Sequence, residues 1–186
     1  LTNDATPTIG GSAEAGSTNT ITFGGATYTV VANGFGQWSL DTGTVLPDSG
    51  AFSPDLNGAN DVAVTSADVA GKSASDATFD EVTIDTTDPV LSITFAPVAT
   101  SVTETAYTVS GNCESADGNV TAGIAGGSPA MRVVGCIANR WSAQFDVSAV
   151  ADGDDALQID ASQTDAAGNT GSTSQLSDKD TTPPSI

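Results

Sequence analysis

The sequence contains an internal repeat, and this feature limits the possible folds more than any other. Four short blocks occur twice in the same order, at separations of 95 to 103 residues. The paired blocks are Thr8–Glu14 with Thr108–Glu114, Gln37–Ser39 with Arg140–Ser142, Ala67–Lys72 with Thr164–Asn169, and Asp85–Pro89 with Asp180–Pro184. Ordered self-similarity of this kind indicates tandem copies of one structural unit. We therefore predict two domains, residues 1–88 and 89–186.

Alternating segments separated by glycine-rich turns predict strands within each unit. Thr20–Phe23 and Thr27–Val31 alternate polar and apolar residues, and no segment has helical apolar spacing over three turns. In the first unit, strands are expected to begin near Thr8, Thr20, Thr27, Gln37, Phe52, Asp61 and Thr78. The second unit carries an additional early segment, 90–106, in which Leu91–Phe95 is expected to form a first strand.

Short strands at this spacing, in units of roughly 90 to 95 residues, are typical of immunoglobulin-like folds. The predicted fold is therefore all-β, with two tandem immunoglobulin-like β-sandwich domains arranged end to end. A strand of about ten residues spans roughly 33 Å, so two such units would form a rod on the order of 70–80 Å long.

The charge balance excludes several classes of function. The chain has 23 acidic and 4 basic residues, no histidine and a formal net charge of −19. Such a chain is not expected to bind nucleic acid or anionic membranes, because it cannot neutralise phosphate groups. Without histidine, a Ser-His-Asp triad and a histidine-ligated zinc site are excluded. We expect neither an enzyme with a small-molecule substrate nor insertion into a membrane.

The acidic residues are mostly aspartates, which suit turns and hard cations. Calcium takes six to eight oxygen ligands from carboxylates, carbonyls and water. If the strand starting at Thr8 is the first of its unit, the turn after it lies at the end where the chain leaves that unit. We therefore expect a calcium site at the junction, formed by Glu14, Asp85, Asp88, Asp165 and Asn169.

Weaker equivalent calcium sites are expected at the outer ends of the pair. Their predicted ligands are Asp4, Asp68, Glu114, Asp178 and Asp180. A further acidic group, Asp152, Asp154 and Asp155, is interpreted as a surface turn or as another weak calcium site. The alternative for all these residues is an ordinary solvated turn in which an aspartate bonds its own backbone.

The two cysteines and the two tryptophans have separate interpretations. Cys113 and Cys136 are predicted to form a disulfide, with free thiols or metal or redox chemistry as the alternatives. Trp38 and Trp141 occupy matching positions in the repeat. They are predicted to be core residues of each sandwich, with an aromatic platform for sugar as the alternative.

The order of the repeated motifs resembles a known family. Thr-x-x-Gly-x-Ala-Glu, Gly-Gly, Gly-x-Trp-Ser, Asp-x-Ala-Gly-Asn and Asp-Thr-Thr-x-Pro are similar to motifs in the immunoglobulin-like extender repeats of giant bacterial surface adhesins, including RTX-type and biofilm-associated adhesins. The resemblance implies tandem domains at the bacterial surface or secreted, often rigidified by calcium at domain junctions. The chain departs from this pattern at Lys72, where asparagine is usual, at Asn33–Gly36, and in its cysteine pair.

Three hypotheses for the function follow. The first is a monomeric stalk segment that holds a distal binding domain away from the cell, with neighbouring repeats of the same chain as its partners. The second is an adhesive module that itself binds a host glycan or protein. The third is an accessory domain of a secreted enzyme. The sequence begins at Leu1 without the pattern of a signal peptide, so we expect a piece of a longer protein.

Overall fold

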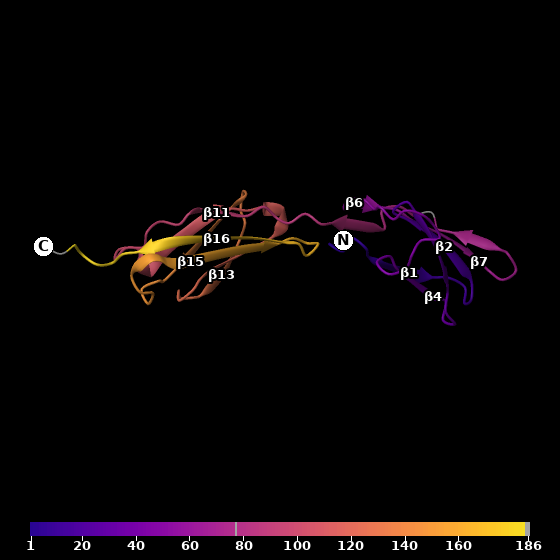
Figure 1. The fold of residues 1–186 in the computed structure, drawn as a ribbon, viewed down its shortest axis with the longest axis horizontal. Helices are drawn as coiled ribbons and strands as arrows, with labels where there is room; N and C mark the ends of the chain where they lie inside the picture. Colours follow the sequence, from indigo (N-terminus) through magenta and orange to yellow (C-terminus); the bar gives the residue numbers. More distant parts are fainter. Residues whose placement is uncertain (77, 185–186) are drawn as a thin grey trace. The chain divides into compact units, whose positions relative to one another are not determined.

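The computed structural model describes residues 1–76 and 78–184. The chain divides into two compact units, Leu1–Thr87 and Asp88–Ile186. This division lies one residue before the expected boundary between 88 and 89, so Asp88 is the first residue of unit 2. Each unit is described separately below (Figure 1).

Unit 1 is built from antiparallel strands in three groups. Its strands are β1 (Thr8–Ser12), β2 (Thr18–Phe23), β3 (Ala26–Val31), β4 (Gln37–Asp41), β5 (Ser49–Gly50), β6 (Asn57–Asn60), β7 (Val62–Ala67), β8 (Ser73–Ser75) and β9 (Val82–Asp85). The largest sheet has the order β5-β3-β2-β7-β8, and the pairs β1-β4 and β6-β9 complete the unit. The all-β class predicted from the sequence is confirmed for this unit.

Unit 2 has two sheets and two short 3₁₀ turns. Its elements are β10 (Ser92–Phe95), η1 (Glu104–Ala106), β11 (Tyr107–Asn112), η2 (Ser115–Asp117), β12 (Val120–Ile124), β13 (Met131–Val134), β14 (Arg140–Phe145), β15 (Gly153–Thr164) and β16 (Thr170–Lys179). One sheet has the order β10-β11-β14 and the other β13-β12-β15-β16. The long strands β15 and β16 lie side by side (Figure 1). Within the described residues, no helix is long and apolar enough to cross a membrane.

Alternating burial along the strands explains why these segments form sheets. In β2, Asn19, Ile21 and Phe23 are buried and the residues between them are exposed. In β14 the buried positions are Trp141 and the two alternate residues that follow it. Since successive side chains of a strand point to opposite faces, each strand covers a core with one face and meets solvent with the other. Each unit encloses its own hydrophobic core.

The predicted strand starts differ from the structure at two places in unit 1. Phe52 was expected to begin a strand, but it follows the two-residue strand β5 and packs its ring edge-on against Phe23, with ring centroids 5.2 Å apart. The strand expected to begin near Thr78 begins at Val82 as β9, and a separate short strand, β8, pairs with β7. Pro54 cannot donate a backbone hydrogen bond, which disfavours a regular strand after Phe52.

The repeat seen in the sequence is also a repeat of strand register. Gly11 of β1 lies opposite Trp38 of β4, and Gly111 of β11 lies opposite Trp141 of β14. Strand β11 is preceded by β10, which pairs with it antiparallel. The strand that begins at Thr8 therefore corresponds to the second strand of unit 2.

The two tryptophans differ in burial. Trp141 is 2% exposed and belongs to the core of unit 2, as predicted. Its indole Nε1 donates a hydrogen bond to the Ser92 carbonyl of β10 at 3.1 Å. Trp38 is half-buried and packs against the edge of the unit 1 core.

The predicted disulfide between Cys113 and Cys136 is confirmed. It joins the residue after β11 to the loop between β13 and β14, across 23 residues of sequence. The Cys113 side chain is 3% exposed and forms part of the unit 2 core. The bond therefore ties the end of β11 to the loop that connects the two sheets of this unit.

Removing the disulfide should destabilise unit 2. In the double variant Cys113→Ala and Cys136→Ala, we expect the free energy of unfolding of unit 2 to fall by about 3 kcal/mol. The reason is that a loop of this length is no longer closed in the unfolded chain. Calorimetric melts of the full chain should show a lower transition temperature for unit 2 only. The matched control is the unit 1 transition, which should not move. Two reactive thiols in the unreduced, denatured parent chain would contradict the assignment.

Candidate metal centre and linker contacts

The last strand of each unit leads into a repeated Asp-Thr-Thr segment. In unit 1, the threonines of this segment donate hydrogen bonds to an asparagine side chain. We call the end where the last strand finishes the exit end, and the opposite one the front end. The Asn57 side-chain Oδ1 accepts hydrogen bonds from the Thr86 backbone N–H at 3.0 Å and the Thr87 hydroxyl at 2.9 Å. Asp85 Oδ1 accepts from the Thr87 N–H at 3.0 Å. Both threonines are therefore fastened to their own unit.

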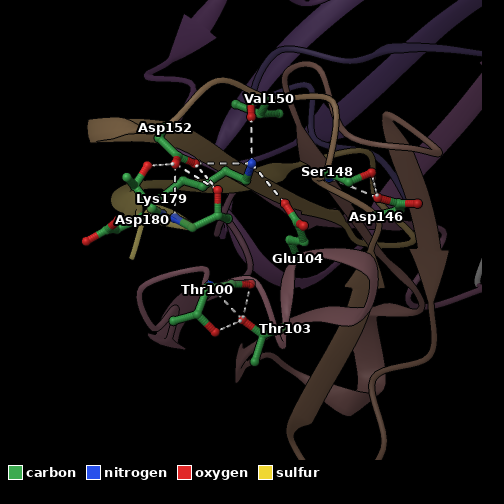
Figure 2. A network of polar contacts seen from close by, with 11 residues as sticks. Thr100, Thr103, Glu104, Asp146, Ser148, Val150, Asp152, Lys179 and Asp180 are labelled. Carbon is green, nitrogen blue, oxygen red and sulfur yellow. Dashed lines mark hydrogen bonds and ion pairs between the residues drawn. The ribbon is translucent and has the colours of Figure 1, made fainter. Parts of the chain in front are cut away.

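Unit 2 repeats this arrangement with an aspartate (Figure 2). Asp152 Oδ2 accepts hydrogen bonds from the Thr181 hydroxyl at 2.7 Å, the Thr181 N–H at 3.0 Å and the Thr182 hydroxyl at 3.0 Å. These bonds to Thr181, together with those from Thr182 and Lys179, lower the pKa of Asp152 to about 2. We call Asn57 and Asp152 the linker clamps. The sequence pattern predicts a surface turn or a weak calcium site at Asp152, and it does not indicate Asn57.

Lys179 neutralises part of the acidic charge at the exit end of unit 2. Its ammonium group lies 3.0 Å from Glu104 Oε2 and 3.4 Å from Asp152 Oδ1, and it donates to the Val150 carbonyl at 2.8 Å (Figure 2). The hydrogen bond with Glu104, followed by the one with Asp152, raises the pKa of Lys179. The residue is 4% exposed, so these partners replace most of its water contacts.

At the front end of unit 2, Glu114 holds the start of the unit. Glu114 Oε2 accepts a hydrogen bond from the Val90 N–H at 2.9 Å. Its backbone carbonyl accepts from Nε2 of the buried Gln163 at 2.7 Å. Pro89 is buried, and its carbonyl oxygen lies so close to Gly171 that no side chain fits there. The residues that follow Asp88 are thus fixed on the front end.

Asp165 and Asn169 form one closed turn at the same end. Asp165 Oδ1 accepts from the backbone N–H groups of Gly168 at 2.7 Å and Asn169 at 2.9 Å, and Asp165 Oδ2 accepts from the Asn169 amide at 2.8 Å. The Asn169 side chain is the main cause of the lowered pKa of Asp165. The equivalent turn in unit 1 uses Asp68 Oδ1, which accepts from the Ala70 and Lys72 N–H groups at 2.8 Å.

Glu14 does not lie beside Asp85, so this part of the predicted junction set is wrong. Asp85 pairs with Asn57 at the beginning of the β6–β7 segment. Glu14 precedes Ser17, whose hydroxyl bonds to Ser66 near the end of that segment, at 2.9 Å. Nine residues of extended chain separate these two positions, which corresponds to about 30 Å. Glu14 belongs to the front end of unit 1, whereas Asp85 belongs to its exit end.

Two residues assigned to the outer ends also have other positions. Glu114 was expected at the outer end of unit 2, but it lies at the front end, where Asp165 is also found. Asp4 follows Thr2, which pairs with Ile84, so Asp4 lies at the exit end of unit 1. Both differences have one cause: β1 and β11 run from the exit end to the front end of their units, opposite to the direction expected for β1.

Two further predicted ligands, Asp178 and Asp180, are engaged in backbone hydrogen bonds. Asp178 Oδ1 accepts from the Asp155 N–H at 2.8 Å, and Asp180 Oδ1 accepts from the Thr182 N–H at 3.0 Å. Across residues 1–76 and 78–184, no group of three or more histidine, cysteine, aspartate or glutamate side chains could hold a metal ion. The carboxylates suit a hard cation chemically. In this conformation, however, the described residues do not form a complete calcium shell.

Comparison with known proteins supports the resemblance found in the sequence. No protein-family model matches the chain, and no match is found among curated proteins. The chain is similar to the solved structure of a Ca²⁺-stabilized adhesin that helps an Antarctic bacterium to reach out and bind ice, with 27% identity and a TM-score of 0.52 over 94% of this chain. The resemblance to bacterial adhesins is confirmed.

Two further adhesin structures have lower similarity. One concerns host cell surface retention of a 1.5-MDa bacterial ice-binding adhesin, with 21% identity, a TM-score of 0.48 and 95% of this chain covered. The other is a tetra-tandem repeat from the extending region of a large adhesion protein, with 20% identity, a TM-score of 0.39 and 96% covered. The chain spans 44%, 59% and 47% of the three adhesin structures, in the order given.

The clamp of unit 2 should make this adhesin-like unit sensitive to acid. Because the pKa of Asp152 is about 2 when folded, against an ordinary value of 3.8, the unfolded chain takes up the proton first as the pH falls. Stability conferred by this carboxylate is therefore present above about pH 4 and lost towards pH 2. In Asp152→Asn, proton uptake on unfolding should fall by up to about one proton per molecule in this window.

Thermal melts between pH 2 and 5 measure this effect. The matched control is Asp154→Asn, two residues away, whose side chain has no hydrogen bond within the described part of the chain. An unchanged pH dependence in Asp152→Asn would show that the clamp does not titrate as expected.

Proposed function

We propose that the chain is a structural segment of the stalk of a large bacterial surface adhesin, at the cell surface or secreted. The observation that carries this proposal is the repeated fastening of linker residues to their own units. Thr87 bonds to Asn57 in unit 1, and Pro89 is buried in unit 2, so one residue, Asp88, stands between two fixed points. A linker with so little slack suits a spacer, whereas mobile modules are joined by long flexible tethers.

We further propose that calcium stiffens this linker. Asp88 is exposed and follows the clamped threonines, and Glu114 and Asp165 lie at the front end of the unit that Asp88 begins. Asp85, which was also predicted as a junction ligand, directly precedes the clamped threonines. Four basic residues in the whole chain cannot balance 23 acids, so a divalent cation would relieve repulsion between carboxylates. The calcium-stabilized adhesin with a similar structure supports the choice of ion.

Calcium should raise the melting temperature of the full chain. A ligand that binds only the native state stabilises it by about 2.7 kcal/mol at a hundredfold excess over its dissociation constant. Asp88→Ala and Glu114→Gln should each reduce this calcium-dependent shift. The matched control is Asp48→Ala, which removes a carboxylate far from the linker in the sequence. If millimolar calcium leaves the melting curve of the parent chain unchanged, the calcium proposal fails.

Small-angle X-ray scattering tests the stalk proposal separately. In calcium, the full chain should give an elongated particle with a narrow distance distribution, and EDTA should broaden that distribution. The Asp88→Ala variant should resemble the EDTA state even with calcium present. A compact particle that does not respond to calcium would contradict the stalk, whereas an elongated particle that ignores calcium would contradict only the stiffening.

A further inference from the structure

One edge of β1 in unit 1 lacks the strand that covers the equivalent edge in unit 2. Strand β11 lies between β10 and β14, with Ile93 of β10 opposite Gly111. Strand β1 pairs with β4, and among the described residues no strand pairs with its other edge. Because Gly11 and Gly111 face their tryptophans in the same register, the uncovered edge of β1 corresponds to the β10 position.

A groove of about 810 Å³ follows this uncovered edge. One side is formed by β1 and Trp38, and apolar side chains on the other side include Val64 and Val82. In unit 2, the equivalent space is occupied by the chain itself, because Leu91 and Ile93 pack against the core there. The groove therefore has the position and the apolar character of a strand-binding surface.

The two tryptophans differ in whether the indole N–H has a hydrogen-bond acceptor, and this difference follows the covered edge in unit 2 and the uncovered edge in unit 1. In unit 2, the Trp141 indole donates to the Ser92 carbonyl, and Gly111 is buried beneath that carbonyl. In unit 1, the Trp38 indole N–H has no acceptor within the described residues, and Gly11 is exposed. A strand carbonyl placed as in unit 2 would satisfy the free donor of Trp38.

A second polar group in the groove also lacks a partner. Asn19 of β2 is fully buried and lines the groove, and its side-chain Oδ1 has no hydrogen-bond donor in the described part of the chain. Buried acceptors without a donor are rare in folded proteins because they lose their hydration without compensation. This observation is independent of the missing strand and also indicates that the groove is incomplete.

We propose that the groove binds an extended strand, antiparallel to β1, with apolar residues at alternate positions as in Leu91–Phe95. Strand addition to a free sheet edge gives affinity through main-chain hydrogen bonds and specificity through alternate side chains. We assign this strand to polypeptide joined ahead of Leu1. Thr2 pairs in parallel with Ile84, as Ala99 pairs with Lys179, and Ala99 follows β10 by only four residues. The inference does not depend on the stalk or on calcium.

Fusing a copy of residues 90–97 directly ahead of Leu1 in the full chain tests this proposal. We expect the amides of β1 to exchange with deuterium at least ~10-fold more slowly, because edge amides become hydrogen-bonded. Quenching of tryptophan fluorescence by acrylamide should also fall as Trp38 is covered. Hydrogen exchange with mass spectrometry reports on β1 locally, and the exchange of β11 should not change.

Two further arms make the result decisive. A fused copy that carries Leu91→Asp and Ile93→Asp should give no protection, because its apolar face is lost. If that copy protects β1 equally, or if the unmodified fusion protects nothing, the groove is not a site for such a strand. The free peptide of residues 90–97 is added to the unfused chain at micromolar concentration. Linkage ahead of Leu1 raises the effective concentration of the strand, so the free peptide should protect β1 less than the fusion does.

Discussion

Antiparallel pairing of the last two long segments in each unit decides which acidic residues can meet. In unit 1, Asn57 lies opposite Asp85, and in unit 2, Gly153 lies opposite Lys179. The partner strand therefore begins where the last strand finishes, and it places Asn57 or Asp152 beside the linker threonines. The positions of Asp85 and Asp152 depend on this pairing, and in unit 1 the residues near the preceding turn are held roughly 30 Å away.

The features that repeat in the sequence were predicted correctly. The predictions that depended on the direction of a strand, such as the end of the unit at which Glu14 lies, were not. The motifs around Trp38 and Trp141 gave the shared strand pattern, and Cys113 with Cys136 was correctly paired. Periodicity identifies a strand but not the number of strands that precede it. As the first strand of its unit, β1 was expected to run towards the exit end, but it runs from the exit end to the front end, where Glu14 lies. Asn57 was missed because an isolated polar residue carries no periodic signal, although it lies at the position corresponding to Asp152.

Most acidic side chains at the unit ends already accept hydrogen bonds from nearby N–H or hydroxyl groups. Asp68 and Asp165 accept hydrogen bonds within their turns, and Asp178 accepts one from the Asp155 N–H. Asp152 accepts hydrogen bonds from Thr181 and Thr182 and forms an ion pair with Lys179. These bonds satisfy carboxylates without any bound ion, which supports the ordinary-turn alternative at these positions. A cation would therefore need to compete with existing bonds or to use the carboxylates beside the linker, such as Asp88.

The two units share a strand pattern but differ in the interactions that stabilise their cores and sheet edges. Unit 2 covers its second strand with β10, closes Cys113 to Cys136 and neutralises acidic charge with buried Lys179. Unit 1 has no disulfide and fills part of its core with a cluster in which Phe52 contacts Phe23 and Tyr28. Its last two short strands, β8 and β9, belong to different sheets, and both contribute residues to the groove beside the uncovered edge of β1. A strand in that groove would contact both β1 and Val82 of β9, and it would complete in unit 1 the packing that β10 provides in unit 2.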